Sequence, residues 1–204
     1  WIIAGFLLLD VMRKLNWRML GDRFNLNVFL AASVAILGLW LIKTGIKPGL
    51  NFHLLGATLL TLMFRARFAL LALALVVAAN TLQSGQYNAF PANYLIMAAA
   101  PVGISWTLYR LVDGKLPNHL FVYIFLNAFF TPAIAIMSVG VLSTAFFTLT
   151  GAYPLNYLLE EYLPFYFLIA WAEAFATGML MTLMVVYRPA WVSTFDDARY
   201  LHGK

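Results

Sequence analysis

The sequence predicts an all-α fold, namely a polytopic membrane helix bundle of about seven transmembrane helices. Hydrophobic residues make up 63% of the chain and charged residues only 10%, against roughly half and a quarter in a soluble domain. Long apolar runs, separated by charged segments or by Pro and Gly, occupy nearly all of the 204 residues. We therefore expect a single integral membrane domain over residues 1–204, surrounded by the lipid bilayer.

Seven apolar runs are long enough, or nearly so, to be membrane helices. They are Trp1–Leu9, Leu26–Ile42, Phe52–Phe64, Phe68–Leu82, Ala92–Tyr109, Leu120–Thr148 and Pro164–Tyr187. The third and fourth runs are shorter than the roughly 17 to 25 residues of a complete crossing. They either extend into flanking residues or are partial helices packed inside the protein, and partial helices would indicate a functional site. Pro132 predicts a kink or a helix end within the sixth run.

The distribution of basic residues predicts the orientation of the chain. If successive loops alternate sides, one side has only Lys43 and Lys47 of the 13 Lys and Arg residues. The other side collects Arg13, Lys14, Arg18, Arg23, Arg65, Arg67, Arg110, Lys115, Arg188, Arg199 and Lys204. Because Lys and Arg concentrate in cytoplasmic loops, this split predicts an external N-terminus and a cytoplasmic tail over residues 188–204. The basic residues form no continuous patch, so a nucleic-acid partner is not expected.

Several classes of chemistry are excluded or disfavoured by what the sequence lacks. Its 204 residues contain no cysteine, which excludes disulfides, thiolate metal sites and a cysteine nucleophile. No Walker A loop, dinucleotide fingerprint or nucleophile motif is present. We therefore expect no enzymatic activity, and any energy for transport would come from a partner or a gradient.

His53 is the candidate metal ligand. It opens the third apolar run, and the predicted topology places it near the external end of a helix, with Gly56 at i+3 on the same face. A neutral imidazole ligates divalent metal ions, and a glycine allows another backbone to approach closely. The alternative is an interfacial histidine that hydrogen-bonds a loop carbonyl. His119, just before the sixth run, is expected to act only as a helix cap or in a loop hydrogen bond.

Glu173 is the only acidic residue well inside an apolar run. A charged side chain near the bilayer centre costs roughly 2.5 to 3.5 kcal/mol. We therefore expect it to face the protein interior with a partner or to carry a proton. The candidate polar partners in the sequence are Asn80, Asn127, Thr177 and His53. Two roles remain open, a structural hydrogen bond between helices and a coupling role in transport.

Three short motifs carry a resemblance to a known transporter family. They are Gly49–Thr58 (GLNFHLLGAT), Pro91–Asn93 (PAN) and Glu173–Thr177 (EAFAT). They resemble the CbiM-type membrane component of cobalt and nickel energy-coupling-factor transporters. In that family a histidine followed by a glycine three residues later opens a helix, and a small residue followed by Asn begins a later one. In its last helix a glutamate precedes a threonine by four residues.

The resemblance implies a permease or substrate-binding subunit for a divalent transition metal such as nickel or cobalt. It implies other membrane protein subunits as partners and a location in the bacterial inner (cytoplasmic) membrane. His53 would be a metal ligand and Glu173 a coupling or structural carboxylate, with Asn93 and Asn127 as polar support. The family site also uses an N-terminal Met-His segment, which is not visible here. Because the first run, Trp1–Leu9, is only nine residues long and no methionine precedes it, we expect further residues upstream of Trp1.

Two alternative functions stay open on sequence grounds. The first is a non-catalytic accessory subunit of a larger membrane complex, which would bind its partners through helix faces and the tail. The second is a gradient-driven small-solute transporter that uses Glu173, because that carboxylate lies deep in the last apolar run.

Overall fold

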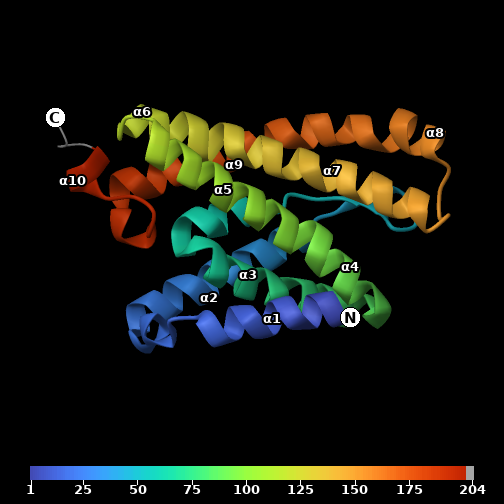
Figure 1. The fold of residues 1–204 in the computed structure, drawn as a ribbon, viewed down its shortest axis with the longest axis horizontal. Coiled ribbons are helices and arrows are strands. Elements are labelled where there is room, and N and C mark those ends of the chain that lie inside the picture. Colours follow the sequence, from blue (N-terminus) through green and yellow to red (C-terminus); the bar gives the residue numbers. More distant parts are fainter. Residues whose placement is uncertain (201–204) are drawn as a thin grey trace.

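The computed structural model describes residues 1–200, most of which are helical (Figure 1). Within this part of the chain, four helical segments are long and apolar enough to cross a membrane. They are Ala57–Ser84, Tyr87–Lys115, Leu120–Leu149 and Leu155–Tyr187, and the shorter apolar helix Asn25–Leu41 accompanies them. The predicted helical membrane bundle is confirmed.

The first half of the chain forms two helices, a hairpin and a broken third helix. In order, the elements are α1 (Ile2–Lys14), η1 (Trp17–Gly21), α2 (Arg23–Leu41), β1 (Thr44–Lys47), β2 (Leu50–Phe52) and α3 (Ala57–Ser84). The two strands pair antiparallel, with Thr44 opposite Phe52. Gly49 lies between the strands with a φ of 84°, a left-handed conformation that glycine adopts without strain.

Three composite helices follow, and in each a π-helical turn separates two α-helical segments. The first consists of α4 (Phe90–Tyr94), η3 (Leu95–Ala99) and α5 (Ala100–Lys115). The second consists of α6 (Leu120–Val122), η4 (Tyr123–Phe130) and α7 (Thr131–Leu149). The third consists of α8 (Leu155–Tyr157), η5 (Leu158–Tyr162) and α9 (Leu163–Tyr187). The short helices η2 (Tyr87–Ala89), η6 (Pro189–Trp191) and α10 (Asp197–Tyr200) complete the described chain.

A proline explains where each π-helical turn ends. Pro101, Pro132 and Pro164 stand in the first turn of α5, α7 and α9, directly after the π turns. Proline has no N–H and its ring collides with the carbonyl four residues earlier, so a regular α-helix cannot continue through it. The wider turn absorbs this mismatch. At Pro132 the hydroxyl of Thr131 also donates to the carbonyl of Leu126 at 2.8 Å.

The predicted third and fourth spans are the two parts of α3, which are divided at Arg65 (φ 64°, ψ 167°). Every residue of the first part, Ala57–Phe64, is buried. This part begins near the middle of the bundle and ends at the tail, where the Ser193 N–H donates to the Met63 carbonyl at 2.9 Å. The second part returns to the other end. The first part is therefore a partial helix packed inside the protein, one of the two expected arrangements.

The start of α3 corrects the sequence prediction. We expected a helix from Phe52 with His53 and Gly56 on one face, but Phe52 ends β2 and the helix begins only at Ala57. Gly56 has the left-handed conformation φ 64°, ψ 13°. The physical reason is that side chains from two other helices bind the Leu55 N–H, the Leu55 carbonyl and the Gly56 N–H. Of these two residues, only Gly56 joins the helix, through its carbonyl, which accepts the Leu60 N–H at 3.0 Å.

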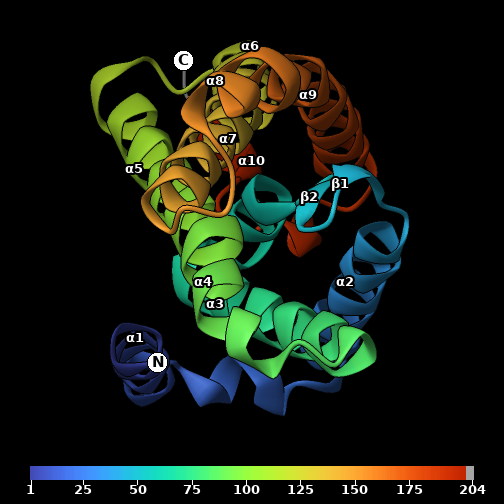
Figure 2. The same cartoon turned by 90° about the vertical axis from the view of Figure 1, so that its right-hand side faces the viewer.

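The end-on view shows where this partial helix lies (Figure 2). The start of α3 occupies the interior, surrounded by α2, the α4–α5 helix, α7 and α9, and the β hairpin lies between α2 and α9 with β1 exposed. Helix α1 lies outside this ring, against α3. The segment around His53 is thus held by helices from both halves of the chain.

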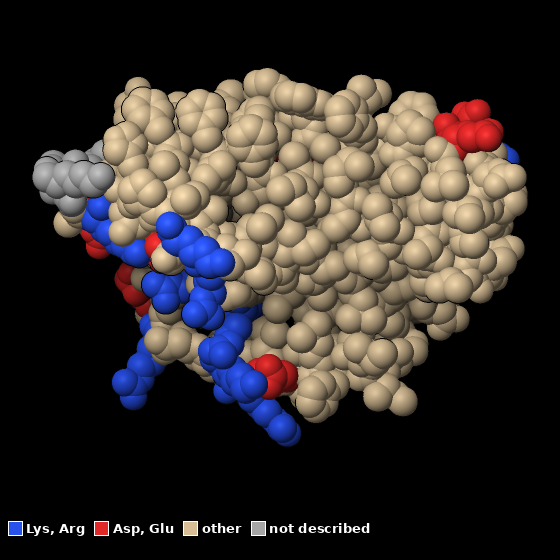
Figure 3. All heavy atoms as spheres, turned by 45° about the horizontal axis from the view of Figure 1, so that its top comes forward, with Lys and Arg blue, Asp and Glu red and all other residues tan. Residues whose placement is uncertain are grey.

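Basic side chains gather at one end of the bundle (Figure 3). Helices α1, α5 and α9 all end there, and the described C-terminal residues lie beside them (Figure 1). On the face shown, a broad region without charged side chains separates this end from the acidic side chains, with one basic side chain beside them, at the other end. We call it the basic end and the opposite one the hairpin end. Lys204, which the sequence assigns to the basic side, lies outside the described residues.

Candidate functional site

Glu173 lies in the interior and binds the loop that precedes α3. Its side chain is 3% exposed. One carboxylate oxygen, Oε1, accepts the Gly56 N–H at 2.7 Å, and Oε2 accepts the Leu55 N–H at 2.8 Å. The expected side-chain partners are not those that bind it, because both oxygens are taken by backbone amides. The carboxylate also lies at the N-terminal end of a helix, where negative charge is stabilised.

Trp40 of α2 holds the same loop from the other side. Its indole N–H donates to the Leu55 carbonyl at 3.1 Å, and its ring lies 4.4 Å from that of His53 between centroids. Ile36, one turn earlier, packs against Gly56 so closely that a Cβ at Gly56 would overlap its Cδ1. Glycine is therefore required at position 56 for two reasons, its positive φ and this contact.

His53 is half-buried in this loop, with Nδ1 3.2 Å from the Leu54 carbonyl oxygen. A carbonyl only accepts, so this bond requires the tautomer with the proton on Nδ1. The lone pair of Nε2 is then free to accept a proton or bind a metal. A bond to a loop carbonyl is what the interfacial alternative predicted, and it is also the arrangement that prepares an imidazole as a ligand.

A polar cavity of about 300 Å³ lies beside His53 at the hairpin end. Besides His53, its polar wall includes Asn51, Asn80, Asn88, Asn93 and Ser143. The ammonium group of Lys43 also lines it and lies 3.5 Å from Oδ1 of Asn80. The cavity therefore brings together an imidazole nitrogen and several amide oxygens, which are neutral ligands, and one positive charge at Lys43.

The two asparagines expected as polar support are placed differently. Asn93, in α4, shares the cavity wall with His53. Asn127, in η4, is completely buried and does not line this cavity. Its amide oxygen and nitrogen both lack a hydrogen-bond partner among the described residues. Only Asn93 is thus in a position to act together with His53.

The ligand set around His53 is incomplete within residues 1–200. No three His, Cys, Asp or Glu side chains of that range gather to hold a metal ion, and His53 is the one such residue on the cavity wall. Trp1 stacks on Phe90 with ring centroids 5.9 Å apart. Because Ala89 and Ala92 line the cavity, the start of α1 lies beside its wall.

The remaining sequence candidate, His119, lies at the basic end. It precedes α6 as its N-cap, and its side chain accepts the Phe121 N–H at 3.2 Å. The expected cap is present, and it accounts for this histidine. Sequence reasoning missed Trp40, because a tryptophan near the end of an apolar run is usually an interfacial residue.

The family model for the cobalt uptake substrate-specific transmembrane region, CbiM, matches residues 1–191. The chain belongs to the CbiM family. It is therefore a multi-pass membrane subunit of a metal transporter, and it is not an enzyme. The resemblance carried by the three motifs is confirmed at the level of the family.

Two solved structures resemble this CbiM-family chain. A crystal structure of a truncated transition metal transporter gives a TM-score of 0.77 at 18% identity, covering 91% of this chain and 92% of that one. A second transition metal transporter structure gives 0.74 at 18% identity, covering 91% and 87%. At this identity they show a shared fold. A comparison with curated proteins finds no match.

Proposed function

We propose that this CbiM-family chain binds a divalent transition metal ion, nickel or cobalt, in the cavity at the hairpin end, with His53 as one ligand. The observation that carries the proposal is the half-buried imidazole on the wall of a polar cavity. Nickel and cobalt bind well to imidazole nitrogen. The ion is the transported substrate, and Asn93 supports its binding as a neutral polar group.

One imidazole cannot hold such an ion tightly. The proposal therefore includes further ligands, either residues outside the range 1–200 or water molecules that stay bound to the ion. The start of α1 lies beside the cavity wall, so any residue upstream of Trp1 would be close enough to the cavity to contribute a ligand. The metal experiments below therefore require the full-length protein.

We assign Glu173 a structural role in this function. Its two oxygens bind the Leu55 and Gly56 amides, which fixes the loop that presents His53. A proton carrier in a gradient-driven transporter would need an oxygen that is free to exchange protons along a path. The two amide bonds therefore favour the structural role over the coupling role.

Metal analysis tests the proposed ligand. Full-length wild-type protein, loaded with nickel or cobalt and passed through a desalting column, is expected to retain about one ion by mass spectrometry. His53→Ala is expected to lose it. His119→Ala is the matched control, because it removes the same side chain at the other end of the bundle and should retain the ion. Metal-free wild-type protein would contradict the proposal.

The proposed orientation places the hairpin end outside and the basic end in the cytoplasm of a bacterial inner membrane. It is supported by the gathering of basic residues at one end and by the positive-inside rule. Because the 204 residues lack cysteine, single cysteines at Lys115 and Glu160 would report the two sides. An impermeant maleimide on intact cells should label only Glu160→Cys, and the reverse pattern would overturn the orientation.

Members of this family are membrane components of transporters, and we propose a nucleotide-hydrolysing subunit and a membrane coupling subunit as partners. The absence of a nucleotide-binding motif from the sequence supports an external source of energy. Co-purification of an ATPase would support this proposal. A stable oxidoreductase or oxygenase partner would instead favour the accessory-subunit alternative.

A further inference from the structure

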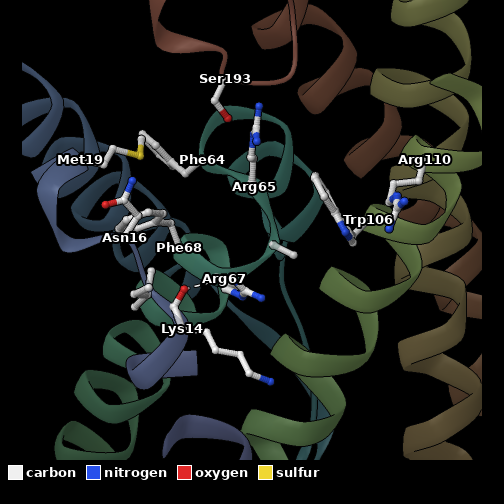
Figure 4. A pocket seen from close by; sticks show the side chains of 12 residues that line it. Lys14, Asn16, Met19, Phe64, Arg65, Arg67, Phe68, Trp106, Arg110 and Ser193 are labelled. Carbon is white, nitrogen blue, oxygen red and sulfur yellow. Dashed lines mark hydrogen bonds between the residues drawn. The ribbon is translucent and has the colours of Figure 1, made fainter. Parts of the chain in front are cut away.

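A second cavity, of about 710 Å³, lies at the basic end and plays no part in the proposed metal site. Four basic residues line it, Lys14 from α1, Arg65 and Arg67 from α3, and Arg110 from α5. Figure 4 shows them on different sides of one space, with Arg65 near the centre and Arg110 beside Trp106. Residues far apart in the sequence thus bring positive charge to the same cavity.

This positive charge is only partly compensated. The Lys14 ammonium pairs with Asp10 at 2.6 Å, and Arg67 donates to the Lys14 carbonyl at 2.9 Å. Within the described chain, the guanidinium groups of Arg65 and Arg110, which belong to exposed residues, make neither an ion pair nor a hydrogen bond. Cations held around one cavity repel one another unless an anion lies between them. The cavity is therefore prepared for a negatively charged group.

The backbone at Arg65 adds a second observation. Its φ of 64° with ψ of 167° is sparsely populated by residues other than glycine. Glycine would make this break in α3 without strain, yet the chain carries an arginine whose side chain lines the cavity. The helix that restarts at Ala66 also directs its positive end to the cavity, because Ala66 and Arg67 form part of the wall.

The rest of the wall shows what kind of anion fits. Leu15, Phe64 and Phe68 give it a buried apolar surface, and Trp106 adds an aromatic ring. The hydroxyl of Ser193, which also lines the cavity, is buried without a hydrogen-bond partner among the described residues. A ligand with an acidic head and an apolar body would satisfy both surfaces.

We propose that this cavity binds the phosphodiester headgroup of an anionic glycerophospholipid, with the start of its acyl chains against the apolar wall. Basic pockets between membrane helices are suited to anionic lipid headgroups, and this one lies where α1 ends and α5 approaches its end, at the basic end of the bundle. A free phosphate would leave the apolar wall unused. An acidic segment of a partner protein would not need acyl-sized apolar surface.

Lipid titration tests this site independently of metal binding. Protein in neutral detergent is titrated with short-chain phosphatidylglycerol or phosphatidylcholine, and bound lipid is counted by native mass spectrometry while unfolding temperature is recorded. Each cation near an anionic lipid surface contributes about fivefold in affinity, so Arg65→Gln with Arg110→Gln should weaken phosphatidylglycerol binding about 30-fold. Arg18→Gln with Lys115→Gln removes the same charge from positions at the basic end that do not line the cavity, and it should retain binding.

A third variant separates lipid binding from folding. Arg65→Gly removes the guanidinium and the backbone strain together, so it should be at least as stable as wild type in detergent alone. It should also lose much of the stabilisation by phosphatidylglycerol. An Arg65→Gly protein that keeps the full response would overturn the proposal.

Four other outcomes would overturn it as well. They are equal binding of the two lipids, wild-type affinity in the cavity variant, an equal loss in the control variant, and saturation by inorganic phosphate at the same concentration as phosphatidylglycerol. Displacement of the lipid by a polyglutamate peptide at lower concentration would assign the cavity to an acidic partner protein instead.

Discussion

The Glu173 carboxylate accepts the Gly56 N–H at 2.7 Å, although 117 residues separate the two in the sequence. This bond joins α9 to the start of the partial helix Ala57–Phe64. At the other end of that helix, the Thr194 hydroxyl donates to the Leu62 carbonyl at 2.7 Å. The buried helix is therefore fixed at both ends by residues from the last part of the chain.

Replacing Glu173 by Gln should destabilise the protein. A glutamine has one acceptor oxygen and an NH₂ group, so one of the two loop amides loses its acceptor inside the bundle. We expect a loss of about 1 to 3 kcal/mol, measured by thermal or denaturant unfolding in detergent. Glu160→Gln is the control, because Glu160 is exposed. Equal stability of Glu173→Gln and wild type would show that the two amide bonds contribute nothing.

Replacing Gly56 by Ala should destabilise the protein more than the same replacement at another glycine of similar conformation. Gly85 has a φ of 70°, and a Cβ added there would have no atom within 4 Å, whereas a Cβ at Gly56 would overlap Ile36. Gly85→Ala reports the cost of the left-handed conformation, about 1 to 2 kcal/mol. Gly56→Ala should cost more, and Ile36→Val should recover part of the excess because it removes Cδ1. Equal losses of stability in the two alanine variants would contradict this account.

Replacing Trp40 by Phe should weaken metal binding without removing a proposed ligand. Phenylalanine keeps an aromatic ring beside His53 but cannot donate to the Leu55 carbonyl. Loss of one neutral hydrogen bond of about 1 kcal/mol should raise the metal Kd about fivefold, measured by calorimetric titration of the full-length protein. Trp171→Phe, at a half-exposed position on α9, serves as control. An unchanged Kd in Trp40→Phe would show that the loop does not need this anchor.

Replacing Thr194 by Val should loosen the tail from the basic end. The Thr194 hydroxyl bonds the Leu62 carbonyl and the Tyr123 hydroxyl, each at 2.7 Å. Valine keeps the shape and leaves both groups unpaired in a buried place, at a cost of about 1 to 3 kcal/mol. Limited proteolysis should then cut the tail faster. Thr107 is exposed and its hydroxyl bonds a carbonyl within its own helix, so the tail of the Thr107→Val control should be cut at the wild-type rate. A wild-type rate in Thr194→Val would show that apolar packing alone holds the tail.

Much of the fold could be predicted because membrane helices leave a strong compositional signal. The sixth run, predicted as Leu120–Thr148, is a helix over Leu120–Leu149. The last run was predicted to begin at Pro164, nine residues after the helix begins at Leu155. Pro154 and the polar Glu160 and Glu161 interrupt the apolar pattern there, which is why the prediction starts too late. The structure continues the helix through them with a π-helical turn.

The candidate site could be predicted only in part. Glu173 and His53 stand out as single residues, because a carboxylate in an apolar run and a histidine beside glycines are unusual in a membrane helix. Their relation could not be inferred, because the groups that bind Glu173 are backbone amides, which every residue has. The sequence pointed to polar side chains as partners of Glu173, whereas its carboxylate binds the backbone amides of Leu55 and Gly56.

The sequence by itself determined that the chain is a helical membrane protein, where most helices lie and that basic residues collect on one side. Hydropathy and charge are local properties, and the bilayer acts on them directly. Only the tertiary structure decided that Gly56 is a left-handed residue before a buried partial helix. That conformation exists because Glu173 binds the Gly56 N–H, Ile36 packs against Gly56 and Trp40 binds the carbonyl of the preceding Leu55. Contacts between distant residues leave no local pattern in the sequence.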